Sequence, residues 1–244
     1  MIGSDELAEL RLELEQQRRL ADSKEQQLER YAADLREVFK AERARAEELS
    51  ESYVATVRAL TNAVEVRDAY TGKHAERVAA YGLEITTRID PDLAAEPQTE
   101  FGFLLHDVGK VAIPDGILHK PYPLSEEEER LMRRHVLIGW EILSGIPFLE
   151  QAATIVRSHH ERWDGLGYPD GLKGEEIPLA ARAFAVADAL DAITTSRPYR
   201  PAASLAEARM SICAAAGTQF DPRVVQALDS TPDAILERLR SGLG

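Results

Sequence analysis

Residues 5–68 contain neither proline nor glycine, and this feature restricts the fold of the chain more than any other. The stretch is rich in Glu, Arg, Gln, Ala and Leu, which favour helix. It therefore predicts one helix of roughly 95 Å at about 1.5 Å per residue. Because such a helix is too long to fold back on one small domain, we expect a helical stalk at residues 1–54 and a second domain at residues 55–244.

The stalk carries an imperfect heptad repeat. One position of the repeat is apolar except at Glu42, and it reads Leu7, Leu14, Ala21, Leu28, Leu35 and Leu49. The companion position is half polar and reads Leu10, Gln17, Lys24, Tyr31, Val38 and Arg45. The phase slips at Leu49 and continues through Tyr53, Val57, Leu60 and Val64. This pattern fits either a solvated charged helix or a marginal coiled coil, and we favour a parallel homodimer that transmits a signal.

From about residue 55 onward the apolar residues follow a helical period. They recur at i, i+3, i+4 and i+7 in segments such as "HAERVAAYGLEITTRI" and "PLAARAFAVADALDAITT". Clusters of Pro, Gly and Asp separate these segments, and none shows sustained β alternation. The sequence therefore predicts an all-α bundle of seven or more helices behind the long N-terminal helix.

Composition limits the partners and the compartment. A net charge of −13 argues against broad nucleic-acid binding, which needs many cationic contacts, so a phosphate ligand would need a local cationic site. The sequence shows no membrane span and no signal peptide. Its one cysteine, Cys213, fits a reducing compartment and is expected to be a small core residue. We therefore expect a cytoplasmic protein.

All six histidines of the chain lie in the second domain. His106 and Asp107 follow the apolar run "FGFLL", and "HDVGK" then adds Lys110, a candidate for a phosphate contact. His159 and His160 can reach one ion only at a helix end or a local distortion, since adjacent helical residues point about 100° apart. Two buried, unpaired histidines would each cost about 1–3 kcal/mol, a penalty that a metal removes.

His135 is a weaker candidate when taken alone, whereas the carboxylates of Asp188 and Asp191 indicate a site. His135 follows Arg133 and Arg134 and by itself indicates a structural or surface histidine. Asp188 and Asp191 lie three residues apart on an otherwise apolar helix, where a buried carboxylate needs a cation or several donors.

Together these residues resemble a known family. His74, the pair His106–Asp107, and Asp188 match the H…HD…D pattern of the HD-domain metal phosphohydrolases. The segment "HHERWDGLGYPDGLKGEEIP", with Gly167, Tyr168 and Pro169, is similar to the extended motif of the HD-GYP subfamily. The resemblance covers about residues 55–230 and includes "ADALDAITTSRPYR" and "GTQFDP".

The resemblance implies a phosphodiesterase that linearises cyclic di-GMP to pGpG, in many members continuing to GMP. It implies one metal held by His74, His106, Asp107 and Asp188, and a second that shares Asp107 and takes His135, His159 and His160. Iron or manganese is expected, while zinc, nickel or magnesium also suit such ligands. Family members with three metals carry a glutamate where this chain has Tyr70, so we expect two metals. His119 is left over and is expected to be exposed.

The resemblance also implies roles around the metals. Asp107 and Lys110 are the expected catalytic residues, and the expected substrate contacts are Asp68, Lys110, Gly167, Tyr168, Pro169, Asp191, Arg197 and Arg200. Asp68 and Asp191 would contact guanine or orient metal ligands. Expected partners are cyclic di-GMP, a second copy of the chain, an upstream sensor or receiver domain, and a GGDEF-type protein at the GYP loop.

Two other readings remain open. The domain would be a sensor or interaction module that binds cyclic di-GMP without cleaving it, or a hydrolase of another nucleotide. For the second, the GYP segment argues against an alarmone such as ppGpp but leaves other cyclic dinucleotides open.

Overall fold

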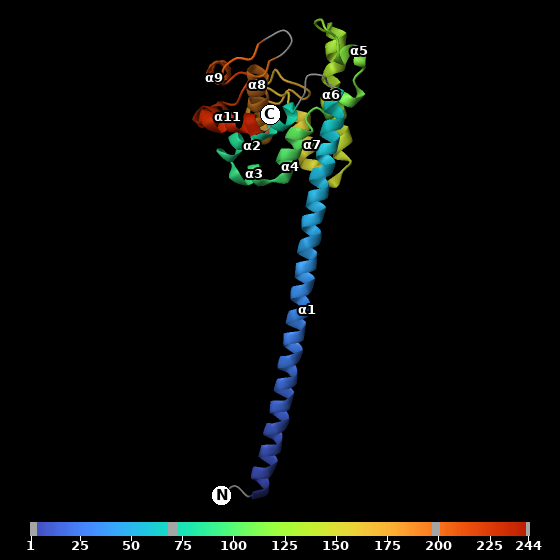
Figure 1. Cartoon of the computed structure of the whole chain (residues 1–244), viewed down its shortest axis with the longest axis vertical. Helices are drawn as coiled ribbons and strands as arrows, with labels where there is room; N and C mark the ends of the chain where they lie inside the picture. The colour runs from blue at the N-terminus through green and yellow to red at the C-terminus, as the bar shows by residue number, and fades with distance from the viewer. Residues whose placement is uncertain (1–3, 68–72, 197–200, 243–244) are drawn as a thin grey trace. The chain divides into compact units, whose positions relative to one another are not determined.

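The computed structural model of the chain describes residues 4–67, 73–196 and 201–242. These residues form α-helices and short 3-10 helices, so the predicted all-α class is confirmed (Figure 1). The α-helices are α1 (Ser4–Glu65), α2 (His74–Thr87), α3 (Pro91–Ala95), α4 (Pro97–Leu104), α5 (Asp115–Leu118), α6 (Glu126–Ser144), α7 (Glu150–Ser158), α8 (Leu179–Thr194), α9 (Leu205–Ala214), α10 (Pro222–Ser230) and α11 (Asp233–Gly242). The 3-10 helices are η1 (Val108–Ala112), η2 (Pro147–Leu149) and η3 (Gly174–Glu176).

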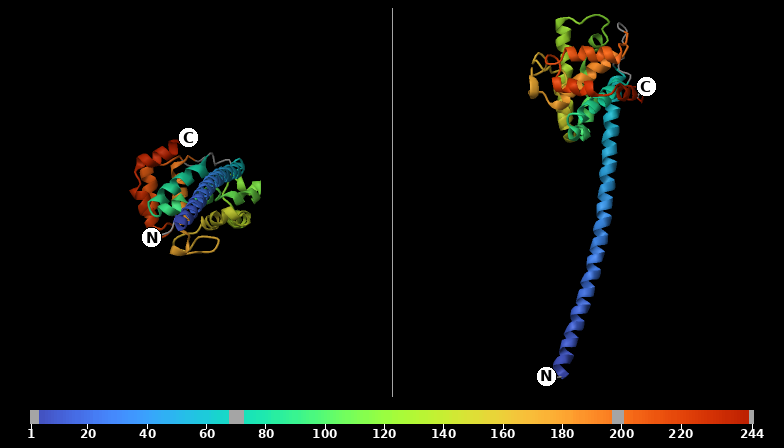
Figure 2. Two further views of the ribbon diagram at one scale, coloured as in Figure 1. Left: turned by 90° about the horizontal axis from the view of Figure 1, so that it is seen from below. Right: turned by 90° about the vertical axis from the view of Figure 1, so that its left-hand side faces the viewer.

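Helix α1 is uninterrupted, as the absence of proline and glycine predicts (Figure 2). The chain divides into two compact units, Met1–Tyr53 and Val54–Gly244, and α1 belongs to both. In the first unit the heptad leucines are exposed, with Leu28 at 67% and Leu35 at 56%. In the second unit Val57, on the last turns of the same helix, is fully buried. No helix among the residues described is long and apolar enough to cross a membrane.

The core of the second unit forms where α2 and α8 pack together, with α4 and α7 beside them. Tyr81 on α2, Phe103 on α4, and Phe184 and Leu190 on α8 are buried there. The helix ends matter most for function, because α2 begins at His74, α4 ends two residues before His106, and α7 ends immediately before His159. A well-packed core thus fixes the positions of chain segments whose polar side chains lie at helix termini.

Gly109 explains how the segment after Asp107 comes so close to α6. A Cβ at this position would lie 1.9 Å from the carbonyl oxygen of His135 and 2.6 Å from the amide nitrogen of Gly139. Only glycine allows this approach, and the approach brings Asp107 and Lys110 within reach of the histidine on α6.

Cys213 corrects one expectation. It was predicted to be a small core residue, but its side chain is exposed on α9. The neighbouring Ile212 takes the buried position, and consecutive helical residues point about 100° apart, so Cys213 faces outward.

Candidate metal centre

Five of the six histidines lie in one cluster. The ring centroids of His74 and His106 are 5.6 Å apart, and those of His106 and His159 are 5.5 Å apart. His159 lies 4.1 Å from His160 and 5.3 Å from His135. Residues from four separate segments therefore meet at one place, whereas His119 is exposed, as expected.

Backbone carbonyl groups set the tautomers of three of these rings. The Nδ1 atoms lie 2.9 Å from the carbonyl oxygen of Phe103 for His106, 2.7 Å from that of Met132 for His135, and 2.6 Å from that of Val156 for His159. A carbonyl oxygen only accepts, so each Nδ1 carries the proton and donates it. In the neutral imidazole Nε2 is then a bare lone pair, which is the form that binds a metal.

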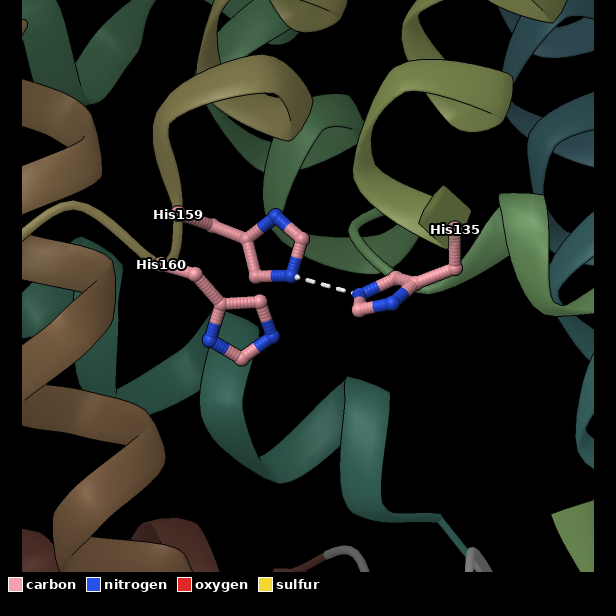
Figure 3. A group of neighbouring side chains, drawn as sticks. All are labelled: His135, His159 and His160. Carbon is pink, nitrogen blue, oxygen red and sulfur yellow. Dashed lines mark hydrogen bonds between the residues drawn. The ribbon is translucent and has the colours of Figure 1, made fainter. Parts of the chain in front are cut away.

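Two of these lone pairs face each other. The Nε2 atoms of His135 and His159 lie 3.3 Å apart, and His160 lies beside them (Figure 3). Burial lowers the pKa of His135. Burial, with the rings of His160 and His135, also lowers the pKa of His159 far below its usual value. Burial above all brings the pKa of His160 to about 3. Both Nε2 atoms are therefore unprotonated near neutral pH, which is the form that binds a cation.

The carboxylate of Asp107 lies between two histidines. Its Oδ2 is 3.0 Å from Nε2 of His106, and its Oδ1 is 3.5 Å from Nε2 of His135. The ammonium group of Lys110 lies 2.8 Å from Oδ2. Burial raises the pKa of Asp107, but His106 and Lys110 outweigh it and hold the pKa well below the usual value. Asp107 is thus an ionised group with one oxygen directed to each side.

Asp191 holds His74 in place. The carboxylate accepts from Nδ1 of His74 at 2.7 Å and from the guanidinium of Arg77 at 2.6 and 3.1 Å. Nε2 of His74, the other ring nitrogen, lies 3.5 Å from Oδ1 of Asp188 and carries the lone pair in the neutral tautomer. Asp191 is only 2% exposed, so its contacts favour the orienting role over a contact with guanine. A carboxylate behind a ligand histidine is a frequent feature of metal sites.

A cavity of about 790 Å³ opens beside the cluster. His159, His160 and Asp188 line it on one side, and Gln219 lies on its wall. Tyr168 also lines it and stacks on His160, with ring centroids 4.8 Å apart.

Tyr168 presents a neutral phenol to this cavity. Burial, the largest influence, raises the pKa of its hydroxyl to about 12. The guanidinium of Arg133 lies over this ring, 4.8 Å from its centroid, and adds a positive charge to the cavity wall.

The loop that carries Tyr168 packs closely against the backbone of residues 161 and 162 and is hydrogen-bonded to Glu161. A Cβ on Gly167 would lie 2.4 Å from the amide nitrogen of Arg162, so only glycine fits there. The buried Glu161 accepts the amide protons of Asp170 and Gly171 at 2.7 and 3.0 Å. Gly167 therefore determines where Tyr168 stands.

The predicted ligands thus lie together: His74, His106, Asp107, His135, His159, His160 and Asp188. His135, His159 and His160 have ligand atoms within 4.8 Å of one another. Imidazole nitrogens and carboxylates suit divalent transition metals, so the donor set is compatible with such ions. Asp68, Tyr70, Arg197 and Arg200 lie outside the described residues, and their predicted roles stay predictions.

Three side chains of the site were not foreseen. Arg77 lies three residues after His74, one turn along α2, and this spacing is a usable signal. Arg133 and Glu161 each lie within two residues of a predicted ligand. Their contacts, however, are with Tyr168 and Asp170 in the GYP loop, further along the chain. No helical period indicates contacts of this kind.

The sequence profile of the HD domain family matches residues 58–224. The chain therefore belongs to the HD domain family.

Individual relatives refine this assignment. The chain is 43% identical over 183 residues to the cyclic di-GMP phosphodiesterase response regulator RpfG of Xanthomonas campestris pv. campestris, covering 74% of this chain and 48% of that protein. It is 40% identical over 171 residues to the 3′3′-cGAMP-specific phosphodiesterase 2 of Vibrio cholerae, covering 69% of this chain and 33% of that protein. The predicted resemblance to HD-GYP phosphodiesterases is confirmed.

A solved structure agrees in fold. The crystal structure of the cyclic GMP-AMP phosphodiesterase V-cGAP3 of V. cholerae superposes with a TM-score of 0.57 at 24% identity. The match covers 77% of this chain and 50% of that one.

Proposed function

We propose that residues 55–244 hydrolyse cyclic di-GMP at a centre of two divalent metal ions. The observation that carries the proposal is the position of Asp107, whose two carboxylate oxygens face different histidines. If the carboxylate of Asp107 bridges two ions, the seven predicted ligands form two groups that share Asp107.

The first metal would be held by His74, His106, Asp107 and Asp188, and the second by Asp107, His135, His159 and His160. Iron or manganese fits this set, and Tyr70 in place of a third carboxylate supports two ions rather than three. Bound there, two divalent ions would supply Lewis-acid stabilisation of phosphate oxygens and an activated water.

The protein's own groups do the remaining work. Lys110, in an ion pair with Asp107, is placed to contact a non-bridging phosphate oxygen and stabilise its developing charge. Tyr168, uncharged because its pKa is about 12, offers a neutral hydroxyl to the nucleotide. The 790 Å³ cavity beyond them is within the range of small-molecule sites. Although the net charge of the chain is −13, the side chains of Arg133 and Lys110 supply positive charge beside the cavity and the predicted ligands.

A second substrate deserves a parallel test. One relative at 40% identity is named a 3′3′-cGAMP-specific phosphodiesterase, and it differs from the cyclic di-GMP enzymes in the base that it accepts. The metal centre acts on the phosphodiester that both substrates share, so the choice between them depends on the cavity wall.

Chromatography of the products tests the function directly. Protein loaded with Mn²⁺ or Fe²⁺ is incubated with cyclic di-GMP, 3′3′-cGAMP or ppGpp, and Asp107→Ala protein serves as the control. We expect pGpG, with or without GMP, from the first substrate. Binding of cyclic di-GMP without product would leave the sensor reading, and faster cleavage of 3′3′-cGAMP would reassign the substrate.

We also propose a homodimer joined through residues 5–50. The exposed heptad leucines of α1 support it, since Leu14, Leu28 and Leu35 are all more than half exposed. An upstream input domain is a further proposal. It is supported by the word response regulator in the name of one relative, of whose length this chain spans 48%.

A further inference from the structure

Arg67 connects the end of α1 to the segment that follows Lys110. Its guanidinium donates to the carbonyl oxygens of Val111 and of Ile113, the second at 3.2 Å, and forms an ion pair with Asp115 at 2.6 Å. It also lies 3.5 Å from the carbonyl oxygen of Lys110 itself. These partners are 43 to 48 residues away along the chain. The planar guanidinium of Arg67 thus contacts several residues at the end of the HDVGK segment and directly after it.

Two further side chains of α1 reach the other segments of the site. The buried hydroxyl of Thr61 lies 3.3 Å from the carbonyl oxygen of Leu104, the last residue of α4 and two residues before His106. The carboxylate of Glu65 accepts the amide proton of Ala75 at 3.1 Å, directly after His74.

Glu65 takes the place of a missing cap. The N-cap residue of α2 is Lys73, which has a left-handed backbone (φ 59°) and no side-chain capping hydrogen bond. An acceptor at a helix N-terminus satisfies a backbone amide that has no partner within the helix. Here that acceptor comes from a different helix, so the start of α2 depends on the end of α1.

We propose that Arg67 is a positioning residue for Lys110 and Asp107, and that Thr61, Glu65 and Arg67 form a clamp at the end of α1 that aligns the three segments of the site. The segment from His106 to Leu118 contains only a 3-10 helix and one short α-helix. Its backbone hydrogen bonds are short-range, such as those from Lys110 to Asp107 and from Ile113 to Lys110, so contacts from outside the segment must fix its position relative to α1. The proposal rests on the proposed function for the roles of Lys110 and Asp107.

The chain offers a matched control for this clamp. Arg58 lies on the same helix and pairs with Glu76 of α2 at 3.5 Å, but its side chain is 53% exposed and away from the HDVGK segment. Arg58→Ala removes a guanidinium and one ion pair, here between α1 and α2. Exposed pairs of this kind contribute about 0–1 kcal/mol, so this variant reports what a lost arginine costs without the clamp.

The test compares Arg67→Ala, Arg67→Lys and Arg58→Ala in the full chain. Metal per chain is measured by elemental analysis after dialysis, amide hydrogen exchange by mass spectrometry over residues 104–118, and kcat and KM with cyclic di-GMP. For Arg67→Ala we expect faster exchange in that segment, KM little changed and kcat lower on the order of 10²-fold, since small misplacement of a catalytic group has that effect. Arg67→Lys keeps the charge but not the planar fork, and we expect only partial rescue.

The outcomes separate the clamp from the proposed function. Wild-type exchange and kcat in Arg67→Ala, or equal losses in Arg67→Ala and Arg58→Ala, would overturn the clamp. If the wild-type chain does not cleave cyclic di-GMP, the proposed function fails, and exchange and metal content still decide the clamp. If Arg67→Ala does not fold, the Arg67→Lys variant carries the same comparison, and wild-type values there overturn the proposal.

Discussion

At the scale of single residues, Asp107 and Lys110 touch each other and yet have separable roles. Asp107→Ala should remove both metals and turnover, because its oxygens face both groups of histidines. Lys110→Ala should keep the metals and lower kcat on the order of 10²–10³-fold, the typical effect of losing one charge-stabilising donor. Elemental analysis and product chromatography of the two variants check this. An Asp107→Ala protein that keeps two metals and normal turnover would show that the bridging arrangement is wrong.

The histidines facing each other give a second prediction. His135→Ala or His159→Ala should lose most of one metal per chain, since their Nε2 atoms lie 3.3 Å apart and both Nδ1 atoms donate to backbone carbonyl groups. His119→Ala is the matched control, because this histidine is exposed and outside the cluster. Elemental analysis decides the matter, and full occupancy in both buried variants would remove these residues from the ligand set.

Asp191 contacts the predicted ligand His74, so replacing it tests whether this contact matters for metal binding. Asp191→Asn keeps the size of the side chain but loses the charge that His74 and Arg77 contact. Loss of such a partner typically lowers metal affinity about 10–100-fold, so we expect weaker binding of the metal at His74 and little change in the fold. Competition with a chelator measures the affinity, and an unchanged affinity would return Asp191 to a direct role with substrate.

At the scale of elements, Gly109 sets the distance between η1 and α6. Gly109→Ala would place a Cβ 1.9 Å from the carbonyl oxygen of His135. Overpacking of a tight contact costs about 1–3 kcal/mol, and here it should also separate Asp107 from His135 and weaken metal binding. Gly116→Ala is the control, since a Cβ there has nothing within 4 Å. Thermal unfolding and metal content of the two variants should therefore differ, and equal values would show that η1 can shift without loss.

The sequence predicts elements better than the contacts between them. The lack of proline and glycine before residue 68 indicates α1, and helical periods indicate the other helices, because both are local properties. His135 shows the limit, since its neighbours suggest a surface position and only the family resemblance assigns it to the metal centre. Gly109, Glu161 and Arg67 act through backbone atoms of distant segments. Such contacts depend on how the helices pack, which no local pattern records.

At the scale of the whole molecule, α1 has apolar residues that its own chain leaves exposed. Two chains in parallel would bury Leu28 and Leu35, while the polar companion position keeps that association weak. The same helix ends at Glu65, which contacts the start of α2 beside His74. If two chains pair along α1 as proposed, a change in their packing could pass along this continuous helix to the residues around His74.

The last prediction tests this coupling with charge. A full-length Leu28→Lys/Leu35→Lys variant should be monomeric, because it places like charges on the heptad seam of both chains. Ala33→Lys adds a charge on the opposite face of the same helix and should leave the dimer intact. Light scattering at micromolar concentration gives the state of each protein, and initial rates with cyclic di-GMP show whether association biases turnover. If the wild-type chain and both variants are monomers with equal rates, α1 before Tyr53 is only a solvated helix. If the double variant alone dissociates and its rate changes, association through the stalk controls turnover, and the clamp at the end of α1 is the proposed route.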